Sequence, residues 1–182
     1  MAIKSWMSWE GGVDLLALTS AEMAQPNVIV HVARMVHTPV GSAPSGMILI
    51  PDGNGAPQLM GFVSSNSNVG EYFGPHIFAG TPFENAPVLQ AEFEFAIDAA
   101  VSASTRIVVQ GDVIELQLST PGALESVDCT PGNLPFHERS LAAKAAGAKL
   151  KFDGQEISLV IPSAGMNGGP AAVYSACGIY ER

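Results

Sequence analysis

The sequence predicts a mainly β, single-domain protein, and an antiparallel β-barrel is favoured slightly over a two-sheet β-sandwich. Gly and Pro number 19 and 13 among the 182 residues, and they separate short runs rich in β-branched residues. Gly and Pro residues spaced between short strand-like runs are typical of antiparallel sandwiches and barrels. They are not typical of chains in which strands and helices alternate. We count about ten or eleven strand-like runs, which is enough to close a barrel.

Hairpins are the clearest local signals, because alternating apolar runs flank short turn sequences in three places. The predicted hairpins are residues 106–118 around Gly111-Asp112, residues 149–161 around Asp153-Gly154, and residues 47–63 around a longer loop from Pro51 to Pro57. Further strands are predicted at residues 13–19, 27–37, 71–78, 88–98 and 172–180.

Strong helix formers are concentrated in one segment, residues 137–149. We therefore expect one short helix near residues 138–146, ending near Gly147. Residues 64–87 and 119–139 form two long connections that contain aromatic and His side chains. Connections of this length are often binding loops, and the alternative is that one of them caps an open end of the barrel.

The strand at residues 27–37 carries two histidines. Simple alternation divides its residues into two faces, with Ile29, His31, Ala33, Met35 and His37 on one and Val28, Val30, Val32, Arg34 and Val36 on the other. The valine face is expected to face the core. His31 and His37 then lie about 20 Å apart along the strand, too far to bind one metal ion. Either histidine could serve singly as an acid or a base, and the alternative is a structural role.

The strand at residues 88–98 carries two carboxylates on one face. Glu92 and Glu94 are two positions apart, which places their Cα atoms about 6.6 Å from each other. This spacing is compatible with a paired-carboxylate site in which one acid stays protonated. The simpler interpretation is that this face of the strand is solvated, whereas in a ligand-binding barrel the same face could point into the lumen.

Aromatic residues of the two long connections could line a small-molecule site together with one imidazole and a carboxylate. The predicted ligand-binding residues are Tyr72, Phe73, Phe78, Phe83, Phe136 and His137, and the predicted catalytic residues are His31, His76, Glu92 and Glu94. The alternative is that these aromatic side chains close the ends of the core.

Charge and motif content exclude several classes of function. The 17 acidic and 8 basic residues give a net charge of −9, which repels nucleic acid and anionic membranes. No apolar stretch approaches the roughly 20 residues of a membrane helix. We identify no nucleotide-binding, nucleophile-elbow or zinc motif, and Cys129 and Cys177 are expected to be reduced thiols. No cofactor or metal is predicted, and the lack of a secretory signal predicts a cytoplasmic protein.

These observations lead to two hypotheses from different classes. The first is a small-molecule-binding β-barrel that performs cofactor-independent acid–base chemistry, of the isomerase, cyclase or lyase type, on a largely apolar substrate. The second is a non-catalytic structural or interaction protein that forms a homo-oligomer, which would explain the low content of charged residues, 14% of the chain.

Overall fold

The chain is mainly β with one short helix over residues 6–98, 101–132, 134–165 and 168–182, which the computed structural model describes. In chain order the elements are β1 (Trp6–Ala17), β2 (Val28–Thr38), β3 (Gly41–Pro51), β4 (Pro57–Ser64), α1 (Ser67–Ile77), β5 (Val88–Asp98), β6 (Ser102–Val109), β7 (Asp112–Pro121), β8 (Glu125–Cys129), β9 (His137–Phe152), β10 (Gln155–Ile157) and β11 (Ala172–Glu181). The predicted fold class is confirmed.

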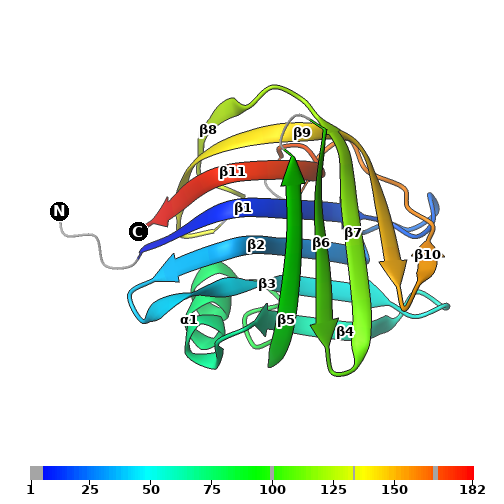
Figure 1. Ribbon diagram of the computed structural model, residues 1–182, viewed down its shortest axis with the longest axis horizontal. Helices are drawn as coiled ribbons and strands as arrows, with labels where there is room; N and C mark the ends of the chain where they lie inside the picture. The colour runs from blue at the N-terminus through cyan, green and yellow to red at the C-terminus, as the bar shows by residue number, and fades with distance from the viewer. Residues whose placement is uncertain (1–5, 99–100, 133, 166–167) are drawn as a thin grey trace.

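The strands form one large sheet that closes into a ring. The order around the described ring is β9, β11, β1, β2, β3, β4, β5, β6, β7 and again β9. Each of these pairs is antiparallel except β4 with β5, and β8 and β10 add to β9 outside the ring. Figure 1 shows β5, β6 and β7 crossing the long strands at a steep angle, so the ring is not a regular barrel.

The three predicted hairpins are present. Pro51 pairs with Pro57 across the longer loop. Asp153 and Gly154 form the β9–β10 turn with φ values of 48° and 78°, as a type I′ turn requires. The third turn lies one residue earlier than predicted, because Val109 pairs with Asp112 and leaves Gln110 and Gly111 in the turn.

The predicted helix near residues 138–146 is wrong, because this segment forms most of the first half of β9. The first half of β9 pairs with β11 and β8, and the second half of β9 pairs with β7 and β10. Buried and exposed residues alternate along most of the strand. The hydrogen bonds and packing offered by four neighbouring strands outweigh the intrinsic helix preference of its alanines and lysines.

The predicted strand at residues 71–78 is also wrong, because residues 71–77 lie in α1 and Phe78 is its C-cap. The side chain of Asn66 caps the helix by accepting a hydrogen bond from the backbone N–H of Asn68 at 3.0 Å. Gly74 allows α1 to lie directly on Phe62, where a Cβ atom would stand 2.2 Å from the ring. Gly74, which disfavours a helix by its intrinsic preference, therefore serves close packing of α1, and Pro75 also lies within the helix.

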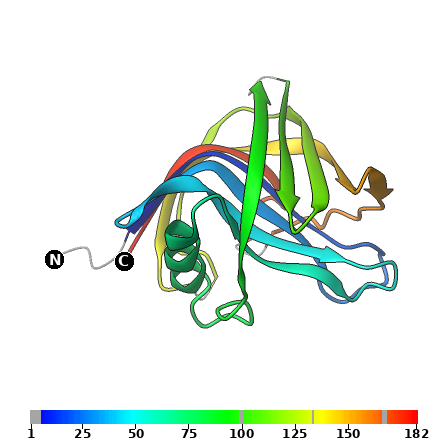
Figure 2. The same cartoon turned by 60° about the horizontal axis from the view of Figure 1, so that its bottom comes forward.

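Two apolar clusters lie on opposite sides of the sheet. The first cluster takes buried residues from all nine strands of the ring and fills its interior, with Val13, Val30 and Leu116 among them. The second cluster lies outside the ring, where α1 packs against the other face of β1–β4. Figure 2 shows α1 beneath the arch of β11, β1, β2 and β3.

A row of irregular residues crosses three neighbouring strands and changes which side chains face α1. Gly11 in β1 has φ +63°, the β2–β3 register shifts between Ala33 and Val36, and the β11–β9 register shifts after Ser175. Ala33 and Val36 consequently belong to the same outer cluster although they are three positions apart. The alternation of side chains between the two faces of the sheet, expected for residues 27–37, is therefore interrupted at this row.

No helix in the described part of the chain is long and apolar enough to cross a membrane.

Candidate functional site

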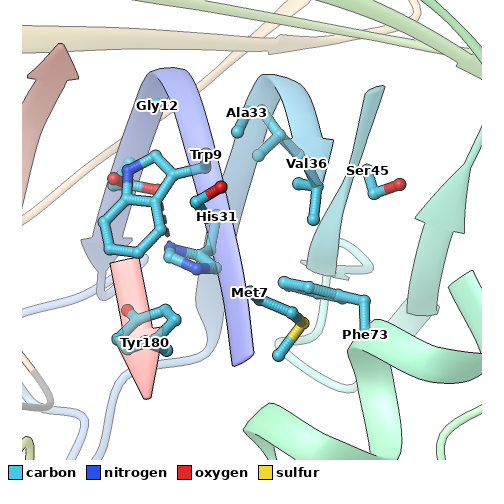
Figure 3. Close-up of a pocket in the computed structure, with 12 residues that line it drawn as sticks. Met7, Trp9, Gly12, His31, Ala33, Val36, Ser45, Phe73 and Tyr180 are labelled. Carbon is cyan, nitrogen blue, oxygen red and sulfur yellow. Dashed lines mark ion pairs between the residues drawn. The ribbon is translucent and has the colours of Figure 1, made fainter. Parts of the chain in front are cut away.

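A small pocket lies outside the ring, between β1, β2 and β11 on one side and α1 on the other (Figure 3). The volume within the pocket that the centre of a water molecule can occupy is about 20 Å³, so the pocket has room for one or two waters. The residues that line it are Met7, Ser8, Trp9, Gly12, Asp14, His31, Val32, Ala33, Val36, Ser45, Phe73 and Tyr180. The irregular row makes this lining possible, because it brings Trp9 and Asp14 to the same face of β1.

An ion pair between His31 and Asp14 forms the polar centre of the pocket. The two residues are direct neighbours on β2 and β1, and His31 Nδ1 lies 2.6 Å from Asp14 Oδ1. A carboxylate at Nδ1 keeps the proton of the neutral ring on that nitrogen, which leaves Nε2 as the acceptor. The side chains are 34% and 24% exposed, and Asp14 Oδ1, the oxygen nearest His31, is buried.

The environment of His31 favours its protonated form. Burial among apolar side chains, including Phe73 and Phe78, acts to lower the pKa of the imidazole. The charge of Asp14, the hydrogen bond to it and the charge of Glu138 together outweigh burial, so the pKa of His31 lies above its usual value of 6.5. His31 therefore keeps its proton to a higher pH than an imidazole with an ordinary pKa.

Tyr180 of β11 forms another wall and is held in its neutral form. Burial, followed by the charges of Glu138 and Asp14, raises the pKa of Tyr180 well above its usual range. Glu138 is the neighbour of Tyr180 across the β11–β9 pair. Glu138 is only 7% exposed and accepts a hydrogen bond from Ser140 at 2.8 Å.

Trp9 is fixed against this wall by three contacts. Its indole N–H donates to Ser175 Oγ at 2.9 Å, and its ring centroid lies 4.6 Å from that of Tyr180. The indole covers Gly178, where any Cβ atom would stand 2.2 Å from the ring. The aromatic wall is therefore held in place by a hydrogen bond and by a close backbone approach.

Several predicted site residues gather on this outer face. Phe73 lines the pocket beside His31, with a ring-centroid distance of 6.4 Å. Phe78 and Phe83 continue the aromatic cluster behind Phe73, and Phe136 packs against Tyr180 at 6.2 Å. The sequence thus identified one aromatic residue of the lining, Phe73, two that contact lining residues, Phe78 and Phe136, and Phe83, which contacts Phe78.

His76 and Tyr72 lie together on α1, not in the pocket lining. Their rings stack with centroids 4.1 Å apart, and His76 Nδ1 is hydrogen-bonded to the carbonyl of Tyr72 at 2.7 Å. His137 lies on β9, where its Nε2 is 2.7 Å from Asp128 on the exposed surface. These three residues are not among those that line the pocket.

Glu92 and Glu94 occupy the exposed face of β5, whereas Phe93 and Phe95 pack against the cluster inside the ring. Glu94 forms an exposed ion pair with Arg106 at 3.6 Å. The solvated interpretation of this face therefore describes the structure, and the apolar interior leaves no place for these carboxylates in the lumen.

His31 and His37 do not share a face, which corrects the alternation expected for residues 27–37. His37 lies beyond the irregular row and contacts Ser42 at 2.8 Å and Glu10 at 3.3 Å. Arg34, expected in register with the core valines, is exposed and pairs with Glu10 at 3.3 Å. A one-residue register shift explains both differences.

Among the residues that sequence reasoning missed are Asp14, Trp9 and Tyr180 of the lining, and Glu138, which acts on His31 through its charge. Asp14 could have been found, because a single carboxylate interrupts the apolar run of residues 13–17. Tyr180 and Glu138 carried no such signal, since their contact depends on the pairing of β11 with a segment expected to be helical. Among the described residues, no group of three or more His, Cys, Asp or Glu is arranged to hold a metal ion.

Comparison with known proteins found no matching family model, no matching curated protein and no matching solved structure.

Proposed function

We propose that the protein binds a small, largely apolar molecule in the pocket beside α1 and that His31 acts there as a general base. The observation that carries this proposal is the 2.6 Å ion pair between His31 and Asp14 at the centre of an aromatic-lined pocket. A base whose orientation is set by a carboxylate is the usual arrangement for proton abstraction near neutral pH.

Each part of the arrangement has a chemical role under this proposal. Neutral His31 accepts a proton at Nε2, and Asp14 stabilises the imidazolium that results. Met7 and Phe73 supply the apolar contact for the bound molecule. Met7 is unbranched, so a change of its rotamer provides room for a molecule larger than two waters.

Acetone is a suitable probe, because it is small, largely apolar and exchanges its methyl protons through an enol. In D₂O, a base removes a proton from carbon and a deuteron from solvent replaces it. We expect the protein to accelerate this exchange, with a rate that rises as His31 loses its proton. The rate is followed by NMR of acetone, and the titration of His31 is followed in the same protein.

His37→Gln is the matched control for His31→Gln. Both histidine side chains are 34% exposed and both lie beside a carboxylate, but His37 does not line the aromatic pocket. We expect His31→Gln to abolish the accelerated exchange and His37→Gln to retain it. Equal rates for the wild type and His31→Gln, or a pH profile unrelated to the titration of His31, would contradict the proposal and leave the non-catalytic hypothesis standing.

A further inference from the structure

The fixed charge of the pocket is negative. Asp14 is in its wall, and Glu138 lies behind Tyr180 and acts on His31 through its charge. The described lining residues include no Lys or Arg, so protonated His31 is their one source of positive charge. When His31 is neutral, the negative charge of Asp14 and Glu138 has no positive partner in the pocket.

Aromatic faces add to this preference for a cation. Trp9, Tyr180 and Phe73 line the pocket from three elements, and Figure 3 shows His31 among them. The face of an aromatic ring attracts a cation, and the Phe73 ring lies nearly parallel to that of His31 at 6.4 Å, whereas the rings of Trp9 and Tyr180 lie against each other at 4.6 Å. The net charge of −9 further favours the approach of cations over anions.

From this geometry we infer that the pocket selects a small organic ammonium ion, which replaces the proton of His31 as the positive partner of Asp14. The ammonium N–H groups donate to the carboxylate, and the carbon substituent lies against Met7 and Phe73. The inference rests on the proposed function and changes its ligand from a largely apolar molecule to one that combines an apolar substituent with a single positive charge. It also explains how a bound ligand would prepare the base, because the ligand's charge favours the neutral imidazole that accepts a proton.

Among the described residues that line the pocket or act on His31, none supplies a competing positive charge. β1 contributes Asp14, β9 contributes Glu138 and β11 contributes neutral Tyr180. α1 and β3 contribute Phe73 and Ser45, which are uncharged. Exchange of one proton for one ammonium ion therefore keeps the charge of the pocket constant, and this exchange makes binding depend on pH.

Methylammonium is the probe, because its two heavy atoms match the room for one or two waters. Histidine-labelled full-length protein is titrated with pH by NMR in methylammonium chloride and in sodium chloride of equal ionic strength. We expect the titration midpoint of His31 to fall by about one unit when methylammonium is at ten times its Kd for the neutral form. We expect Asp14→Asn to weaken methylammonium binding at least about tenfold, since it removes a charge-assisted hydrogen bond.

His137 is an internal control in the same spectra. It contacts Asp128 at 2.7 Å, a pair of the same chemistry on the open surface, and its midpoint should be equal in the two salts. A titration midpoint of His31 that is unchanged or raised in methylammonium chloride would overturn the inference. A His31 midpoint raised by sodium acetate would also overturn it, because it would identify an anion site. If His31 still catalyses acetone exchange, the ligand class alone is wrong; if His31 responds to neither probe, the proposed function fails as well.

Discussion

Gly74→Ala tests whether close packing of α1 on Phe62 holds the outer wall of the pocket in place. The added Cβ atom would stand 2.2 Å from Phe62 Cδ2 and 2.5 Å from two further ring atoms. Carbon atoms pack at about 3.6 Å, so helix and ring must separate by about 1.4 Å. Phe62 is fully buried and contacts Phe73 and Phe78, so the ring has little freedom to move away.

The expected loss of stability follows from two opposing effects. Overpacking of a core costs about 1 to 3 kcal/mol, and replacing Gly by Ala within a helix returns about 1 kcal/mol. We expect the larger part of the overpacking range, because the contact involves three atoms of an immobile ring. The free energy of unfolding should then fall by about 1 to 2 kcal/mol, which lowers the Tm by about 2 to 8 °C for a chain of this size.

Urea denaturation and thermal melting measure this change, with Gly53→Ala as the matched control. A Cβ atom at Gly53 meets no atom within 4 Å, so that variant should differ from the wild type by less than about 0.5 kcal/mol. If Gly74→Ala proved as stable as Gly53→Ala, the contact between α1 and Phe62 would not be the constraint described here.

Two further predictions concern the ion pair and a turn. Asp14→Asn removes a charge that raises the folded-state pKa of His31 above 6.5. The pair stabilises the fold fully below pH 6.5 and less as the pH rises through the folded-state pKa of His31. Urea denaturation should therefore show that the variant has a lower free energy of unfolding than the wild type, by an amount that shrinks as the pH rises. A difference that grows with pH would refute the assignment. Gln110 has φ 55° in the turn with Gly111, so Gln110→Asn should raise the free energy of unfolding by about 0.5 to 1 kcal/mol, and a lower midpoint in urea would count against the turn geometry.

Sequence rules correctly predicted the elements whose backbone conformation is set by their own few residues. The turn at Asp153-Gly154 requires two positive φ values, a demand that those two residues meet without help from the rest of the chain. The loop from Pro51 to Pro57 was found for the same reason, because proline and glycine restrict or permit backbone angles wherever they occur. The mainly β class followed from many such signals together.

Elements that depend on distant partners were mispredicted. Residues 137–152 form a strand because four other strands pair with them, and no local feature of their sequence reveals those partners. The helix at residues 67–77 requires glycine where it meets Phe62, which reads locally as a helix breaker. Both errors arise from tertiary contacts that override intrinsic preference.

The candidate site was predicted in part. His31 and Phe73 were identified because imidazole and aromatic side chains are conspicuous in any chain. Asp14 was missed although it interrupts an apolar run, and Tyr180 was missed because its position depends on which strands flank β11. Plain alternation would place Trp9 and Asp14 on opposite faces of β1, and the irregular row at Gly11 brings both to the face that lines the pocket.

The position of β11 between β1 and β9 also has a consequence for how the chain reaches its native state. Trp6 pairs with Glu181, so the ring closes through contacts between residues that are far apart in sequence, and such closure is intrinsically slow. A nascent chain that lacks β11 exposes the open edges of both β1 and β9, which are templates for aggregation. His31 and Asp14 can meet earlier, on neighbouring strands, but they gain the wall formed by Tyr180 only when β11 is in place. The pocket wall therefore forms only after β11 has been synthesised and has paired with β1 and β9.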